Sequence, residues 1–425
     1  MKKDLPLIIY LFLAVFQPPL LPVNFIYIFG LLTLILLRRE PKDMVKKVVN
    51  LSKIRKMYGF FVGLTIYIFV VGCIDMLFIE SADLLTTRIR CINQLLILSF
   101  FQFCSIVYIL VQCEKRNYEF ENIVRLLITV AFIQGCCAIA AFMSPSIREL
   151  FIMFGDRDLY DNEFFLERRG FGFSMTLIDT FGYGMGLIAG YLLLYQWKEK
   201  DRKRIIILLL ILFTIAVNAR TGIVVFGIAL LLKFVQNKTK LQIVLMAIPC
   251  ILIFSYSQTI IPFILKAGIN SENPTLVWIC SDMLEMYYML FAQGTSDAMA
   301  MDEVTFLSNF IGLPTNGFEL VFGSGHYVYD TYQTLGFRTD IGYYNMFWEF
   351  GIIVSIIILV FFTRWLLGPY WHSKDKSMIN IAVFNFICYA FLLLKAILLG
   401  YNPGVFINYL ITFSMYYYMK KRCFS

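Results

Sequence analysis

The chain has 425 residues and a formal net charge of +8 at pH 7, with 59% hydrophobic and 16% charged residues. A soluble domain carries about 25% charged residues, so this composition, with its mean hydropathy of +0.73, excludes an ordinary soluble protein. The positive charge does not indicate nucleic-acid binding, because the Lys and Arg residues lie in short loops between apolar runs.

Apolar runs long enough to cross a bilayer as helices recur along the whole chain. They predict an all-α fold, a polytopic transmembrane helical bundle of about twelve segments. We expect one integral membrane domain over residues 1–425. The predicted segments are residues 5–17, 20–37, 58–79, 92–111, 123–143, 175–196, 205–218, 221–235, 241–261, 342–362, 378–399 and 405–419.

The loops between these segments alternate between rich and poor in Lys and Arg. Cytoplasmic loops carry the excess of Lys and Arg, so both termini are predicted to be cytoplasmic. Two long loops, residues 144–174 and 262–341, then face outward. The second lies between the ninth and tenth segments and is long enough to hold short helices of its own.

A polar turn, Asn218-Ala219-Arg220-Thr221-Gly222, separates the seventh and eighth segments at their outer ends. Arg220 has two interpretations there. It is a snorkelling anchor, or it binds phosphate oxygens through its planar guanidinium. We favour the second, because an anchor would not need the surrounding Asn, Thr and Gly.

The sixth segment contains a glycine series, Gly182, Gly184, Gly186 and Gly190. No predicted strand precedes it, so it does not fit a dinucleotide-binding fingerprint. We expect these glycines to allow close helix packing.

The first outer loop ends in Glu167-Arg168-Arg169-Gly170. Adjacent arginines on the outer face run against the positive-inside trend. They are either part of a solvated loop or a second clamp on an anionic substrate. No Cys/His cluster has the spacing of a zinc site, and a bridge between Cys91 and Cys280 is conceivable but not favoured. No metal and no cofactor are predicted.

The second outer loop ends in a polar, aromatic and glycine-rich stretch that runs into the tenth segment. His326 follows Gly323-Ser324-Gly325 and is either a proton carrier or a hydrogen-bonding loop residue. Asp340, next to Arg338, stands at the mouth of the tenth segment. A carboxylate at that depth can serve as a base, and we rank it above His326.

Glu349 lies deeper in the tenth segment than Asp340. The sequence leaves two roles open for it. It lines a cavity, or it pairs with Lys395 of the next segment.

Four features of the chain resemble the superfamily of O-antigen polymerases and ligases, that is, the Wzy-type polymerases and their lipopolysaccharide ligase relatives. One is the polytopic frame with a large loop late in the chain. The other three are short motifs: Ala219-Arg220-Thr221-Gly222, Phe322-Gly323-Ser324-Gly325, and Asp340-Ile341-Gly342-Tyr343-Tyr344-Asn345 running into Phe350-Gly351-Ile352-Ile353.

Two departures bear on which member of the superfamily the chain is similar to. Ligases usually have a histidine where Asp340 stands, whereas polymerases often have an aspartate, so the resemblance favours a polymerase. The loop helix near residues 281–291 often carries an arginine in the family. This chain has Asp282 and Glu285 there instead, which leaves a further phosphate-binding arginine unassigned.

The resemblance implies a GT-C-like fold and a metal-independent glycosyltransferase in the bacterial inner membrane, with a periplasmic active site. The donor and the acceptor would be undecaprenyl-diphosphate-linked glycans, and a chain-length regulator and a flippase would be partners. Alternatives are a lipopolysaccharide O-antigen ligase and, in another class, a lipid-linked oligosaccharide flippase. The implied site residues are Asp340 and His326 for catalysis; Arg220, Arg169, Arg168 and Arg338 for the diphosphate; and Tyr327, Tyr343 and Tyr344 for the glycan.

Overall fold

The structure, a computed structural model, is all-helical in the part of the chain that it describes. The all-α class is therefore confirmed for those residues. They are residues 4–18, 25–78, 91–153, 179–197, 203–218, 220–236, 265–270, 317–325, 342–393 and 402–424, with the single positions 89, 172, 174, 277, 280, 281 and 284.

A helix occupies each predicted segment except 241–261, which lies outside the described residues. A π-helix, η2 (Asn93–Leu98), leads into α6. The α-helices are α1 (Leu5–Phe16), α2 (Phe25–Arg38), α3 (Lys42–Leu51), α4 (Ile54–Phe78), α6 (Ser99–Lys115), α7 (Phe120–Met143), α8 (Pro145–Met153), α11 (Asp179–Leu194), α12 (Lys203–Asn218), α13 (Arg220–Gln236), α17 (Gly317–Phe322), α19 (Gly342–His372), α20 (Lys376–Leu392) and α21 (Pro403–Phe424).

Four stretches are long and apolar enough to cross a bilayer, namely Ile54–Ile74, Asn93–Lys115, Phe120–Met143 and Asn345–His372. Other apolar helices, such as α1 and α11, are shorter than the roughly 20 residues that a straight span needs. The structure thus supports a membrane protein, while the full number of spans stays a prediction.

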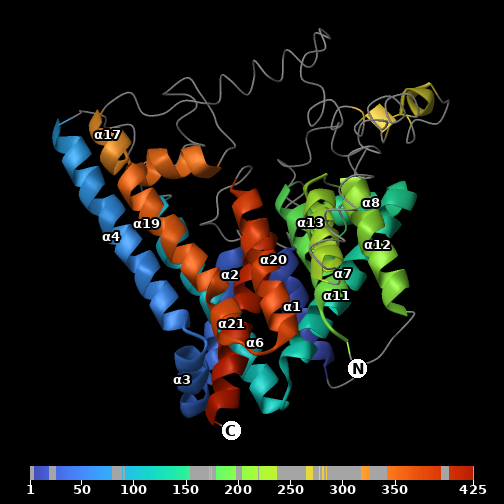
Figure 1. The fold of residues 1–425 in the computed structure, drawn as a ribbon, viewed down its shortest axis with the longest axis horizontal. Coiled ribbons are helices and arrows are strands. Elements are labelled where there is room, and N and C mark those ends of the chain that lie inside the picture. The colour runs from blue at the N-terminus through green and yellow to red at the C-terminus, as the bar shows by residue number, and fades with distance from the viewer. Residues whose placement is uncertain are drawn as a thin grey trace.

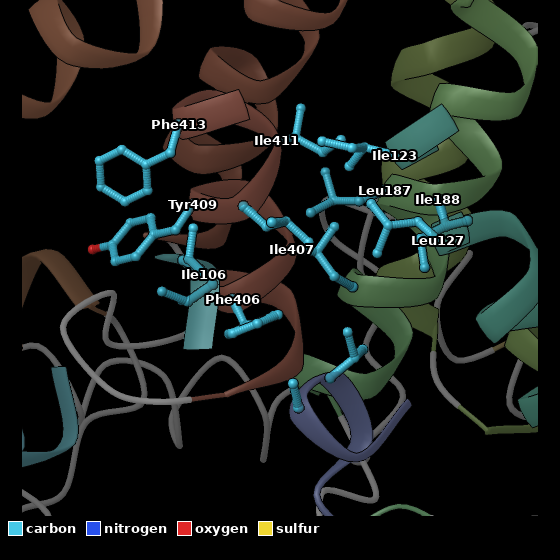
Figure 2. Packing of buried hydrophobic residues seen from close by; sticks show 14 of the residues in the cluster. Ile106, Ile123, Leu127, Leu187, Ile188, Phe406, Ile407, Tyr409, Ile411 and Phe413 are labelled. Atoms are coloured by element: carbon cyan, nitrogen blue, oxygen red, sulfur yellow. The ribbon is translucent and has the colours of Figure 1, made fainter. Parts of the chain in front are cut away.

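The centre of the bundle is built on α21 and α11. α21 is buried on every side from Pro403 to Tyr418, as expected for a helix that is apolar around its whole circumference. Figure 2 shows its Ile407 reaching toward Leu187 of α11, with Leu127 of α7 on the far side. The outer helices are packed around this pair.

Glycines let α11 and α13 approach closely. A Cβ on Gly186 would lie 2.8 Å from the Gly222 carbonyl oxygen, and one on Gly222 would lie 2.5 Å from the Gly182 carbonyl oxygen. A Cβ on Gly190 would meet the Phe384 ring of α20 at 2.2 Å. Close helix packing, the interpretation favoured from the sequence, is confirmed for these glycines.

The outer surface of the bundle is apolar along the length of several helices. Phe69 of α4, Ile206 of α12, Leu231 of α13 and Ile357 of α19 are all more than half exposed. Apolar surface spread over several helices in this way is unusual on a soluble monomer and is the expected face toward lipid tails.

One end of the bundle is basic. Its charged residues come from α3, the first turn of α4, the ends of α6, α19 and α21, and the short connections beside them; we call it the basic end. Glu114 of α6 joins two neighbours there, since it accepts from Lys47 of α3 at 2.8 Å and from Lys421 of α21 at 2.5 Å. Figure 1 shows α3 and the C-terminus at this end, and α17 with the start of α19 at the opposite end.

Candidate functional site at the kink of α19

α19 is interrupted by Gly351, whose backbone is non-helical at φ 69° and ψ 171°. A residue in this conformation breaks the hydrogen-bond ladder of the helix, because carbonyl groups before the break lose the amides four residues ahead. The sequence predicts an uninterrupted segment here, so the kink is a finding of the structure.

The segment after α17 takes up these carbonyl groups. The amide of Ser324 donates to the carbonyl oxygen of Trp348 at 2.8 Å, and the amide of Gly325 donates to that of Glu349 at 3.1 Å. The Ser324 hydroxyl donates to the Trp348 carbonyl as well, at 2.9 Å. The end of the second outer loop is therefore bound to the backbone of α19.

Both glycines at this junction are required by geometry. Gly323 has φ 78° and Gly351 has φ 69°, in the left-handed region that other residues rarely adopt. A Cβ on Gly323 would lie 2.5 Å from the Gly351 nitrogen, and one on Gly351 would lie 2.3 Å from the Val321 carbonyl oxygen. These contacts are to backbone, which cannot turn away as a side chain can.

α4 completes the junction through one side chain. The Tyr67 hydroxyl donates to the Phe322 carbonyl oxygen at 2.6 Å and lies 3.4 Å from that of Phe350. One tyrosine thus contacts both docked segments. Its role could not be predicted from the sequence, since a single tyrosine in an apolar run is a common interfacial residue.

Two polar side chains lie buried just before the kink. Asn345 is fully buried and Glu349 is 2% exposed. They stand four residues apart and so share a face of the helix. Glu349 Oε1 and both amide atoms of Asn345 have no hydrogen-bond partner among the described residues. An ionisable group at such a depth is costly and marks a functional site by default.

These atoms bear on the two roles that the sequence left open for Glu349. Lys395 lies outside the described residues, so its pairing is not described. Both roles of Glu349 therefore stay predictions.

The turn between α12 and α13 is a second polar feature. Asn218 and Thr221 are buried, and the Asn218 amide donates to the Thr214 carbonyl at 2.9 Å. α13 begins at Arg220, whose side chain lies outside the described residues. Gly222, two residues after Arg220, packs against Gly182 of α11. The motif is therefore placed tightly at a helix junction.

Of the predicted glycan-binding residues, Tyr343 is described in full and has a packing role. It is half-buried, its amide donates to the Leu393 carbonyl at 3.2 Å, and its hydroxyl donates to the Ala390 carbonyl at 3.4 Å. It holds the start of α19 to the end of α20. Tyr344 lies in the same turn, with its side chain outside the described residues.

The other predicted site residues also lie outside the part of the chain that the structure describes, so their grouping stays a prediction. Among the described residues, no cluster of His, Cys, Asp and Glu has the size of a metal site, and Cys91 and Cys280 are both free thiols. The predicted site residues that lie outside the described part of the chain are Asp340, His326, Arg338, Arg168, Arg169 and Tyr327.

The described residues define a helical membrane protein with several candidate spans and a buried polar site at a broken helix. No family model matches the chain, and no curated protein or solved structure matches it either. Its function is therefore argued from the site.

Proposed function

We propose that the chain is a polysaccharide polymerase that joins undecaprenyl-diphosphate-linked repeat units at the outer face of a bacterial inner membrane. One observation carries the proposal. The backbone of Gly323-Ser324-Gly325 is bound to the kink of α19 beside Gly351. Two short motifs that resemble those of O-antigen polymerases thus meet in space, although they lie far apart in the sequence.

The proposed chemistry needs a diphosphate site and a base. Arginine forks bind phosphate oxygens and stabilise the charge that builds on a leaving diphosphate. Arg220, at the turn packed against Gly182, is our first candidate, with Arg168, Arg169 and Arg338 as further ones. A base, Asp340 or His326, would take the proton from the attacking sugar hydroxyl.

The ends of the described segments support this arrangement. Gly325, which precedes His326, is bound to the Glu349 carbonyl. α19 begins at Gly342, just after Asp340. His326 therefore adjoins a segment bound to the kink, and Asp340 adjoins the helix that contains the kink. Glu349 and Asn345, just before the kink, supply buried polar atoms that are suited to binding a sugar hydroxyl.

The Arg220 assignment predicts a specific mutational result. Arg220→Lys keeps the charge but loses the bidentate fork, so polymerisation should fall while the protein still inserts. Losing one charge-assisted hydrogen bond costs about 1.5–3 kcal/mol, which is roughly a 10- to 150-fold loss of rate. The measurement is polymer formed per unit of membrane-inserted protein.

Arg125→Lys is the matched control, because Arg125 is exposed, and its ion pair with Glu121 and its cation–π contact with Trp197 both involve residues outside the proposed site. It should keep full activity. Full activity in both Arg220→Lys and Arg220→Ala would reduce Arg220 to a membrane anchor.

The orientation is a separate prediction. The concentration of Lys and Arg at one end of the bundle supports a cytoplasmic basic end. Alkaline phosphatase fused at Asn273 should be active, and the same enzyme fused after residue 425 should be inactive. Phosphatase activity at the C-terminal fusion would contradict the proposed location of the active site.

A further inference from the structure

A cavity of about 490 Å³ opens at the basic end, between the start of α4, the second half of α19 and α21. Its volume is within the range of small-molecule sites. Three cations and several apolar side chains surround it. The lining residues used below are Lys53, Lys56, Arg364, Ile356, Ile357, Val360, Phe361 and Tyr416.

We propose that this cavity binds an anionic phospholipid, with the phosphate among Lys53, Lys56 and Arg364 and the acyl chains along α19. Arg364 lies 13 residues beyond the kink of α19, about 20 Å along the helix. The proposal does not depend on the proposed polymerase activity.

Among the described residues, the positive charge of the three cations around the cavity is not compensated by a carboxylate. Lys53, Lys56 and Arg364 form no ion pair with a described carboxylate, whereas the carboxylates nearby are already engaged. Glu114 pairs with Lys47 and Lys421, and Asp375 pairs with Arg422. Burial, followed by repulsion from Lys420 and Lys56, lowers the pKa of Lys53. A bound phosphate would relieve this repulsion.

Lys53 is held in position by two features. Its ammonium lies 3.8 Å from the centre of the Tyr416 ring, a cation–π contact. Its backbone has φ 63°, in the left-handed region. A non-glycine residue in that conformation is strained. Strain of this kind often occurs at ligand sites, and here it presents a cation at the turn between α3 and α4.

The apolar side of the cavity favours a lipid over a free phosphate. Ile356, Ile357 and Val360 are about half exposed on the outer surface of α19, so the cavity is continuous with the face toward the lipid tails. The Phe361 ring stacks on Phe60 of α4, with centroids 3.8 Å apart, and joins the two helices. A lipid uses both the charged and the apolar part, whereas inorganic phosphate uses only the first.

The test is lipid binding to the full-length purified protein in detergent, read by native mass spectrometry. Phosphatidylglycerol and phosphatidylcholine of equal chain length are added separately. The protein should retain phosphatidylglycerol preferentially. The triple variant K53Q/K56Q/R364Q should bind it at least about ten-fold more weakly, since each cation near an anionic headgroup contributes to the attraction.

The matched control is R39Q/K42Q/K46Q, which removes three exposed cations at the same end but outside the cavity. It should bind phosphatidylglycerol as the wild type does. Equal loss in both triple variants, or equal retention of the two lipids by the wild type, would overturn the proposal. Displacement of the lipid by millimolar glycerol phosphate would also overturn it and indicate a free-phosphate site.

A second variant guards against misfolding. K53G removes the cation and relieves the left-handed backbone, so the protein should fold at least as well as the wild type. It should still show weaker binding of phosphatidylglycerol. Unchanged lipid binding in a folded K53G protein would contradict the role assigned to Lys53.

Discussion

Asp340→Asn is expected to abolish polymerisation and leave the glycan at its first repeat. Asparagine keeps the shape and the hydrogen-bonding capacity of the side chain but cannot accept a proton usefully. General-base catalysis contributes about 10²–10⁴ to the rate, so a loss of that size would isolate the proton-transfer role. The measurement is the length distribution of the glycan at normal expression of the variant.

His326→Ala is the informative partner of this variant. It should leave part of the polymerisation, because we rank Asp340 first as the base. His372→Ala is the neutral control, since His372 is exposed at the basic end, at the far end of α19 from the kink. A normal ladder in Asp340→Asn with a single repeat in His326→Ala would reverse the assignment and move the base to the glycine turn.

Gly351→Ala is expected to detach the loop end from α19 and destabilise the protein. An alanine at φ 69° and ψ 171°, a conformation nearly restricted to glycine, costs about 1–3 kcal/mol. Its Cβ would also lie 2.3 Å from the Val321 carbonyl oxygen, and overpacking of this kind costs about 1–3 kcal/mol. The two together predict a loss of about 2–6 kcal/mol. Thermal unfolding in detergent, together with polymer formation, measures the effect.

Gly227→Ala is the matched control, because a Cβ on Gly227 meets no atom within 4 Å. In the middle of α13 this change should be neutral or stabilising by about 0.5–1 kcal/mol. Equal stability and activity of the two variants would show that the kink does not hold the loop end in the functional protein.

Much of the fold follows from the sequence, because a membrane helix satisfies its own backbone. The apolar runs predicted the positions of α1, α7 and α13 to within a few residues. The glycine series in α11 predicted close packing, which the contact between Gly186 and Gly222 confirms. These are local signals, readable from composition and spacing along one helix.

The kink in α19 could not be predicted in this way. A lone glycine in an apolar helix is tolerated at small cost, and the sequence around Gly351 otherwise predicts a continuous span. Its left-handed backbone depends on Gly323 and on hydrogen bonds from Ser324, more than twenty residues earlier. Such an arrangement depends on contacts between residues far apart in the sequence, and the hydrogen bond from Tyr67 to the Phe322 carbonyl is another of these.

The candidate site likewise has parts that could be predicted from local sequence and parts that could not. The sequence singled out the segments of Gly323 and Arg220 by their polar residues in apolar surroundings, and the structure places both at tight junctions. Sugar stacking by Tyr343 stays a prediction; the structure adds that its hydroxyl holds α19 to α20. Hydrogen bonds between helices that lie far apart in the chain cannot be predicted from the local sequence of one helix.

The most direct test of the proposed function is the surface glycan of a strain that lacks this chain, separated by length on a gel. A polymerase predicts a single repeat unit on the lipid core in place of the ladder, with the ladder restored by the wild-type chain and not by Asp340→Asn. Bare core with accumulated lipid-linked polymer would indicate a ligase instead, and an unchanged ladder would contradict the account.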